Sequence, residues 1–152
     1  VFGRGGEEWA ACVEAGVPVT VIPGVSSALA VPALAGIPLT HRTLTQGFVV
    51  VTGHVPPGDP RSMVDWEWLG RSGLTLVVLM GVAALPQISA ALVNGGMDPD
   101  TPAACVADGG MHSMRSVTAT ITTLAAAAEA ADLRPPAVTV IGDVVTALQE
   151  SS

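Results

Sequence analysis

The amino-acid sequence predicts an α/β protein in which short apolar strands alternate with helices. Two uninterrupted apolar runs, GFVVVTG at 47–53 and LTLVVLMG at 74–81, have the length and composition of strands buried on both faces of a sheet. Stretches with helical spacing of apolar residues follow these runs. Hydrophobic residues form 49% of the 152 residues and charged residues 12%, so the chain contains enough apolar material for a sizeable core.

The first part of the chain is expected to contain only one strand, between two helices. In order, the pattern predicts a helix at 7–15 stopped by Gly16, a strand at 18–24 (PVTVIPG), and a buried helix at 26–36 that Pro32 kinks or interrupts. One strand is too little for a sheet. We therefore interpret residues 1–42 as the C-terminal end of one α/β domain plus a connector, and residues 43–152 as a second domain.

The second part of the chain has enough strands for a sheet of its own. We expect strands at 45–54, 74–81, 102–110, 116–121 and 135–145. Helices are expected from Ser62 or Asp65 to 71, at 82–96 before a Gly-Gly stop, and at 122–133 with a threonine cap. The last residues, 146–152, are expected to be a frayed tail.

Composition and charge exclude several classes of function. The net charge is −7, and all six basic residues are arginines, so no basic face can be assembled for nucleic acid. No apolar run approaches the ~20 residues of a membrane span, and no signal peptide is visible. The two cysteines are far apart, which is typical of unpaired thiols in a reducing cytoplasm, and the histidines lack metal-ligand spacing.

Four predicted strands end in glycine-containing turns, which are the usual ligand sites of open α/β sheets. These turns are PGVSS at 23–27, TGH at 52–54, LMG at 79–81 and ADGG at 107–110. From the residues alone, Ser26 or Ser27 can simply cap a helix, and Met80 can be a core methionine. Arg4 and Glu7 can equally form a solvated ion pair at a helix start.

Taken together, several of these segments resemble the tetrapyrrole methylase family. The resemblance is carried by FGRGGEE at 2–8, VIPGVSSALAVPALAGIPLTHR at 21–42, VVTGH at 50–54, LVVLMG at 76–81 and PPAVTVIGDVV at 135–145. It implies two α/β domains with S-adenosyl-L-methionine (SAM) in the cleft between them, and a homodimer. It also implies that a Gly-Gly-Asp-Pro loop of the cofactor site precedes Phe2, so the chain is expected to be a fragment.

The resemblance is strongest to members that methylate uroporphyrinogen III. It implies methyl transfer from SAM to carbons 2 and 7, which gives precorrin-2 for sirohaem and cobalamin synthesis and leaves S-adenosyl-L-homocysteine. A sibling activity on precorrin-4 or another precorrin stays open, because the PGVSSA segment is shared widely. So does the alternative that residues 1–152 are a non-catalytic fragment that does not bind SAM alone.

Position by position, the resemblance also implies roles for eight residues. Arg4 and Glu7 match a catalytic pair at the substrate face, and Arg42 and Met80 match substrate contacts. The cofactor contacts it implies are Ser26, Ser27, Met80, Gly109 and Ala137. The chain departs from the family pattern in GMHSMRSV at 110–117, where Arg115 is kept but His112 and Met114 replace the usual proline and glutamine.

Overall fold

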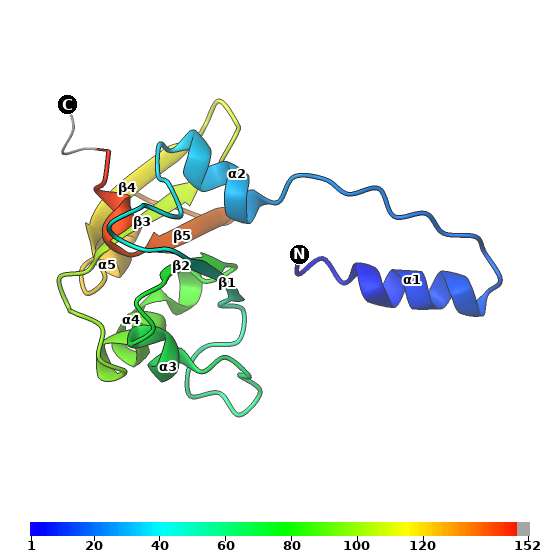
Figure 1. Ribbon diagram of the computed structural model, residues 1–152, viewed down its shortest axis with the longest axis horizontal. Helices are drawn as coiled ribbons and strands as arrows, with labels where there is room; N and C mark the ends of the chain where they lie inside the picture. The colour runs from blue at the N-terminus through cyan, green and yellow to red at the C-terminus, as the bar shows by residue number, and fades with distance from the viewer. Residues whose placement is uncertain (149–152) are drawn as a thin grey trace.

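A computed structural model describes residues 1–148, and its central feature is a five-stranded mixed sheet (Figure 1). The strand order is β1-β2-β5-β3-β4, with β1 parallel to β2 and the other neighbouring pairs antiparallel. The strands are β1 Phe48–Thr52, β2 Thr75–Leu79, β3 Pro102–Ala107, β4 Arg115–Thr120 and β5 Ala137–Ile141. The helices are α1 Gly5–Glu14, α2 Ser27–Leu34, α3 Trp66–Gly70, α4 Leu85–Asn94 and α5 Leu124–Ala130, with 3₁₀ turns η1 Val82–Ala84 and η2 Asp143–Val145. The predicted α/β class is confirmed.

Each face of the sheet carries its own core, because successive side chains of a strand point to opposite faces. In β2, Leu76 and Val78 belong to one cluster, and Val77 and Leu79 to the other. The first cluster also takes in side chains of α3, α4 and α5, and the second takes in α2 and η2. All five residues of β2 are buried, as expected for an apolar run covered on both faces.

Helices α3 and α4 approach each other closely through two glycines. A Cβ on Gly70 would lie 2.2 Å from the carbonyl oxygen of Leu92, and one on Gly95 would lie 2.3 Å from that of Glu67. Only glycine allows the two backbones to come so near. The close packing of α3 on α4 fixes the helical layer below one face of the sheet (Figure 1).

The N-terminal segment differs from the expectation in one respect. Helix α1 forms where the spacing predicts, but none of its residues is buried, and it lies away from the sheet (Figure 1). The strand predicted at 18–24 is wrong: these residues run as an exposed segment that pairs with no strand among residues 1–148. Val19, Val21 and Ile22 have the side chains of a strand, but no neighbouring backbone supplies the ladder that a strand needs.

Two local expectations about helices are also corrected. Pro32 does not interrupt α2, which continues to Leu34, and its carbonyl accepts hydrogen bonds from the N–H groups of Ala35 (3.1 Å) and Ile37 (2.8 Å). Thr123 precedes α5 as predicted, but its side chain does not cap the helix. Its Oγ1 instead accepts from the N–H of Thr120 at 3.1 Å.

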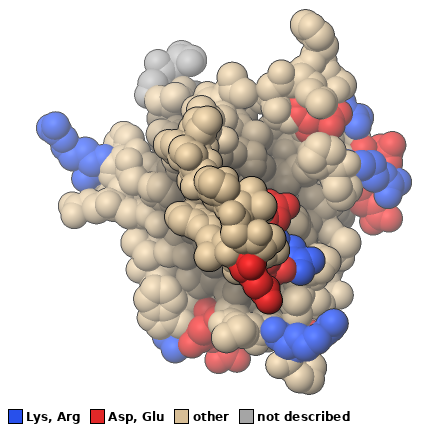
Figure 2. Space-filling model, turned by 90° about the vertical axis from the view of Figure 1, so that its right-hand side faces the viewer, with Lys and Arg blue, Asp and Glu red and all other residues tan. Residues whose placement is uncertain are grey.

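Charged side chains are few and scattered. On the face shown in Figure 2, arginines lie in small separate groups, several of them beside acidic residues, with wide uncharged areas between. That face therefore presents no continuous basic surface of the kind that binds a phosphate backbone. None of the helices described in residues 1–148 is long and apolar enough to cross a membrane. Of the expected C-terminal tail, residues 149–152 lie outside the described part of the chain.

Candidate functional site

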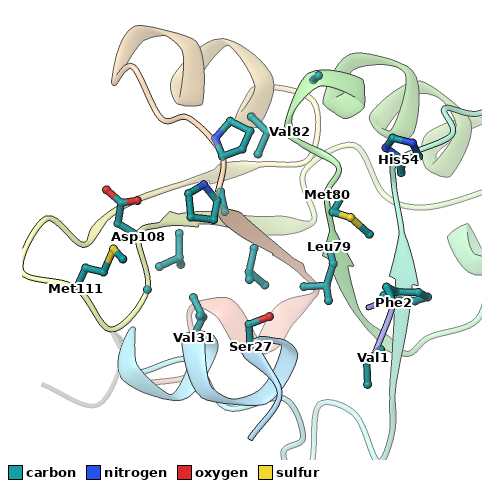
Figure 3. Close-up of a pocket in the computed structure, with 17 residues that line it drawn as sticks. Val1, Phe2, Ser27, Val31, His54, Leu79, Met80, Val82, Asp108 and Met111 are labelled. Carbon is teal, nitrogen blue, oxygen red and sulfur yellow. The ribbon is translucent and has the colours of Figure 1, made fainter. Parts of the chain in front are cut away.

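One edge of the sheet carries a cavity of about 530 Å³ (Figure 3). Strands β1, β2 and β3 end at this edge and β5 begins there, as shown by the pairings Thr52–Leu79, Leu79–Val138 and Ala107–Ala137. The volume falls within the range of about 300–1,000 Å³ that is usual for sites of small molecules. The cavity thus occupies the place where α/β sheets commonly bind ligands.

The walls of the cavity are mainly apolar, with a few polar groups at its rim. Helix α2 borders it on one side, and the turn after β2 and the Pro135–Pro136 segment border it on another (Figure 3). The lining residues are Val1, Phe2, Ser27, Val31, His54, Leu79, Met80, Val82, Ala83, Val106, Asp108, Gly109, Met111, Pro135, Pro136, Ala137 and Val138. An apolar cavity with a few polar groups is typical of a site that binds an organic ligand.

Close backbone approaches shape the ends of the strands. A Cβ on Gly53 would lie 2.6 Å from the Cα of Gly81, so the ends of β1 and β2 pack against each other through two glycines. A Cβ on Gly109 would lie 2.3 Å from the Cγ2 atom of Val31, so the end of β3 packs directly on α2. The glycines that the sequence places at these turns are therefore required by packing.

Three residues with side chains adopt the left-handed backbone conformation at the cavity. Phe2 has φ 55°, Met80 has φ 57° and Asp108 has φ 53°. This conformation is uncommon for residues other than glycine, asparagine and aspartate, and such residues gather at functional sites. At the ends of β2 and β3, this conformation turns the chain sharply, and the side chains of Met80 and Asp108 line the cavity (Figure 3).

The structure brings together four of the five residues that the resemblance assigns to the cofactor. Ser27, Met80, Gly109 and Ala137 all line the cavity, although they come from four different segments of the chain. Ser26 does not line it. Its Oγ accepts a hydrogen bond from the N–H of Ala28 at 3.3 Å, so it caps α2.

The remaining predicted residues lie elsewhere. Arg4 and Glu7 form an exposed ion pair on α1, in which Arg4 Nε donates to both carboxylate oxygens at 3.1 and 3.0 Å. The hydrogen bond to Glu7 raises the pKa of Arg4 above its ordinary value. Arg42 is exposed in the turn that the backbone bonds between His41 and Thr45 close. None of the three lines the cavity, so their roles stay predictions.

Several cavity residues were not singled out by the sequence. Asp108, His54 and Met111 line the cavity, and so does the buried Val31 of α2. Asp108 stands within the ADGG turn that the sequence did mark as a strand end. Among residues 1–148, no group of three or more histidine, cysteine or acidic side chains is placed to hold a metal ion.

The fold and the cavity define an α/β protein with a cavity of small-molecule size at the ends of its strands. The chain belongs to the Tetrapyrrole (Corrin/Porphyrin) Methylases, because the sequence model of that family matches residues 1–125. This agrees with the resemblance seen in the sequence.

Two individual proteins are similar to the chain over most of its length. The chain is 44% identical over 145 residues to the S-adenosyl-L-methionine-dependent uroporphyrinogen III methyltransferase of Methanosarcina barkeri, covering 95% of this chain and 57% of that protein. It is 41% identical over 145 residues to the siroheme synthase of Thiobacillus denitrificans, covering 95% of this chain and 30% of that protein. The chain therefore spans little more than half of the first relative's length and under a third of the second's.

A solved structure shares the fold. The uroporphyrin-III C-methyl transferase of Thermus thermophilus, in complex with S-adenosyl homocysteine, superposes with a TM-score of 0.79 at 38% identity. The match covers 97% of this chain and 63% of that one. The chain therefore has the same fold as the matching 63% of the Thermus methyltransferase.

Proposed function

We propose that the protein containing this chain transfers methyl groups from SAM to carbons 2 and 7 of uroporphyrinogen III, and so makes precorrin-2. The observation that carries the proposal is the meeting of Ser27, Met80, Gly109 and Ala137 at one cavity. The resemblance assigned these residues to the cofactor separately, and they are up to 110 positions apart in the chain (137 − 27). The names of the relatives in Methanosarcina and Thermus support the same activity.

The residues present fit SAM in shape and in charge. The cavity has the volume of a small-molecule site, and Gly109 lets the end of β3 pack directly on Val31 of α2 at its wall. Apolar walls from Leu79, Val106 and Val138 suit a flat adenine ring. No arginine lines the cavity within the described residues, and Asp108 is acidic, so the site does not repel a sulfonium cation.

The side chains at the ends of the strands would hold the reacting partners rather than exchange protons with them. Bound SAM would supply a methyl group on a sulfonium, which an electron-rich pyrrole carbon would attack in line while S-adenosyl-L-homocysteine leaves. Such a reaction depends on alignment and on a site that excludes water. Met80, directly after β2, and Ala137, at the start of the neighbouring β5, would set the alignment, and the apolar walls would keep water out.

Arginine is the expected anchor of the substrate. Uroporphyrinogen III carries eight carboxylates, and guanidinium groups bind carboxylates through paired hydrogen bonds. We propose that Arg4, oriented by Glu7, and Arg42 hold these carboxylates, and that Arg4 assists proton loss after methylation. The ion pair between Arg4 and Glu7 supports the orienting role of Glu7. Arg4→Lys keeps the charge but loses the planar fork, so retention of full turnover would contradict this role.

The test of the proposed function is a methyl-transfer assay with the full-length protein. Labelled SAM is supplied with uroporphyrinogen III in one reaction and with precorrin-4 in another. We expect label to enter uroporphyrinogen III, with two methyl groups per product. Label entering precorrin-4 alone would transfer the assignment to the sibling activity. Absence of transfer to both would contradict the proposal.

The homodimer and the cytoplasmic location implied by the resemblance are part of the same proposal. Size-exclusion chromatography with light scattering tests whether the full-length protein is a homodimer.

A further inference from the structure

We propose that Asp108 recognises the ribose of the cofactor by accepting hydrogen bonds from its two hydroxyl groups. This inference rests on the proposed function, because it assumes that SAM occupies the cavity. The resemblance assigns no role to Asp108, but the residue lines the cavity. Three properties of Asp108 favour this role: its fixed backbone, its free carboxylate and its position relative to Met80.

The backbone of Asp108 is held on both sides. Its N–H donates to the carbonyl oxygen of Pro136 at 3.0 Å, which ties the end of β3 to the segment before β5. Its own carbonyl accepts from the N–H of Met111 at 2.9 Å, which closes the turn after the strand. With φ at 53°, the residue keeps a left-handed conformation that aspartate tolerates and these two bonds stabilise. The Cα–Cβ direction at the rim of the cavity is therefore fixed (Figure 3).

The carboxylate of Asp108 is free to accept hydrogen bonds from a ligand. Among the hydrogen bonds and ion pairs of residues 1–148, none uses its side chain, although the residue is half-buried. The side chains of four other aspartates accept a local hydrogen bond: Asp59, Asp65, Asp98 and Asp132. The side chains of Asp100 and Asp143 accept none within the described residues, but both residues are exposed and neither lines the cavity. Asp108 is also the only acidic side chain among the described lining residues, and no arginine there neutralises it.

A free carboxylate at this position fits a sugar diol better than other parts of the cofactor. Its two oxygens can accept from two neighbouring hydroxyls at once. In dinucleotide-binding α/β folds, an acidic residue likewise accepts a hydrogen bond from the ribose 2′-hydroxyl. Asp108 and Met80 lie on opposite sides of the cavity (Figure 3). The resemblance gives Met80 both a substrate contact and a cofactor contact, so Met80 is expected beside the methyl group that is transferred. Asp108, across the cavity, then faces the adenosyl end.

The experiment measures binding of S-adenosyl-L-homocysteine, of SAM and of an S-adenosyl-L-homocysteine analogue without ribose hydroxyls, by calorimetry on the full-length protein. The variant is Asp108→Asn, which removes the charge and one acceptor oxygen but tolerates the left-handed backbone. The matched control is Asp132→Asn. Asp132 has φ 49°, is exposed, pairs with Arg134 and does not line the cavity.

We expect Asp108→Asn to weaken binding of SAM and of S-adenosyl-L-homocysteine by the same factor, about tenfold, because both ligands carry the ribose. The analogue without hydroxyls should bind the unaltered protein and Asp108→Asn equally, and Asp132→Asn should bind all three ligands like the unaltered protein. Equal binding of S-adenosyl-L-homocysteine by Asp108→Asn and the unaltered protein would overturn the inference and leave the proposed function standing. Weaker binding of SAM alone would also overturn the inference, since the carboxylate would then act on the sulfonium. Failure of the unaltered protein to bind either natural ligand would overturn the proposed function and the inference together.

Discussion

Gly109 at the end of β3 lies directly against Val31 of α2, and a Cβ at position 109 would come within 2.3, 2.6 and 2.9 Å of three atoms of the Val31 side chain. This contact joins the sheet to the helix that begins at Ser27, so it sets the distance between two walls of the cavity.

The Gly109→Ala substitution should force α2 away from β3. We expect a loss of about 1–3 kcal/mol in the free energy of unfolding, as for other overpacked cores, together with weaker binding of S-adenosyl-L-homocysteine. Val31→Ala in the same protein should restore part of both losses, because it removes the side chain that the new methyl group meets. Urea unfolding and calorimetry measure the two effects. Unchanged stability of Gly109→Ala would show that the contact is not tight.

Ser26 and Ser27 should separate into a structural and a binding residue. Ser26→Ala removes the cap of α2 and should lower the free energy of unfolding by about 1 kcal/mol, with little effect on ligand affinity. Ser27→Ala should leave stability nearly unchanged and weaken S-adenosyl-L-homocysteine binding about two- to tenfold, the range for one hydrogen bond. Thermal unfolding measures the stability of both variants, and calorimetry measures their affinity for S-adenosyl-L-homocysteine. Weaker binding by Ser26→Ala together with lower stability of Ser27→Ala would exchange the two roles.

Asp59 should titrate well below an ordinary aspartate. Arg61 donates to it from Nε at 3.0 Å, from Nη2 at 2.7 Å and from its backbone N–H at 2.9 Å, and these bonds lower the pKa of Asp59 to about 2. Because the folded-state pKa lies below the usual 3.8, the ionised carboxylate favours folding above about pH 4, and this contribution disappears as the pH falls towards 2.

Carboxyl-carbon NMR of Asp59 tests this directly. Arg61→Ala should raise the pKa of Asp59 part of the way to its usual value, since only the backbone hydrogen bond remains. Asp65, which caps α3 through the N–H of Trp68, gives a second aspartate in the same spectrum for comparison. A midpoint near 3.8 for Asp59 in the unaltered protein would refute the arrangement of this turn.

The two cysteines should differ sharply in reactivity. Cys105 is fully buried in β3, and burial raises the pKa of its thiol, so little thiolate forms there. Cys12 lies on α1 and is only half-buried. A chromophoric disulfide reagent at neutral pH should therefore modify one thiol quickly and the second only on unfolding. Cys12→Ser should abolish the fast reaction; a fast reaction that persists in this variant would mean that β3 is accessible.

The sheet could be predicted from the sequence because each strand is a short run of apolar or alternating residues. The run from Thr75 to Leu79 is apolar throughout, and the structure buries all of it. The segment at 18–24 has equally suitable side chains, yet it forms no strand, because a strand also requires a partner and local composition does not supply one. A similar limit applies to Thr123, whose hydroxyl bonds to Thr120 instead of capping α5.

The candidate site was predictable only in part. Glycine-containing turns marked the ends of the strands, and the resemblance selected Ser27, Met80, Gly109 and Ala137, which the fold brings to one cavity. The spacing of Ser26 and Ser27 did not distinguish the helix cap from the cavity residue, since that depends on the first turn of α2. Asp108 was missed because its interest arises from a free carboxylate on a cavity wall, which only the folded chain reveals.

A crystal structure of the full-length protein with S-adenosyl-L-homocysteine would show whether the cavity at the ends of β1, β2 and β3 is the SAM site. We expect ligand density against Met80, Gly109 and Ala137, with the ribose at Asp108 and the sulfur towards Met80. Ligand density elsewhere in the protein, with none in this cavity, would show that the cofactor binds at a different site.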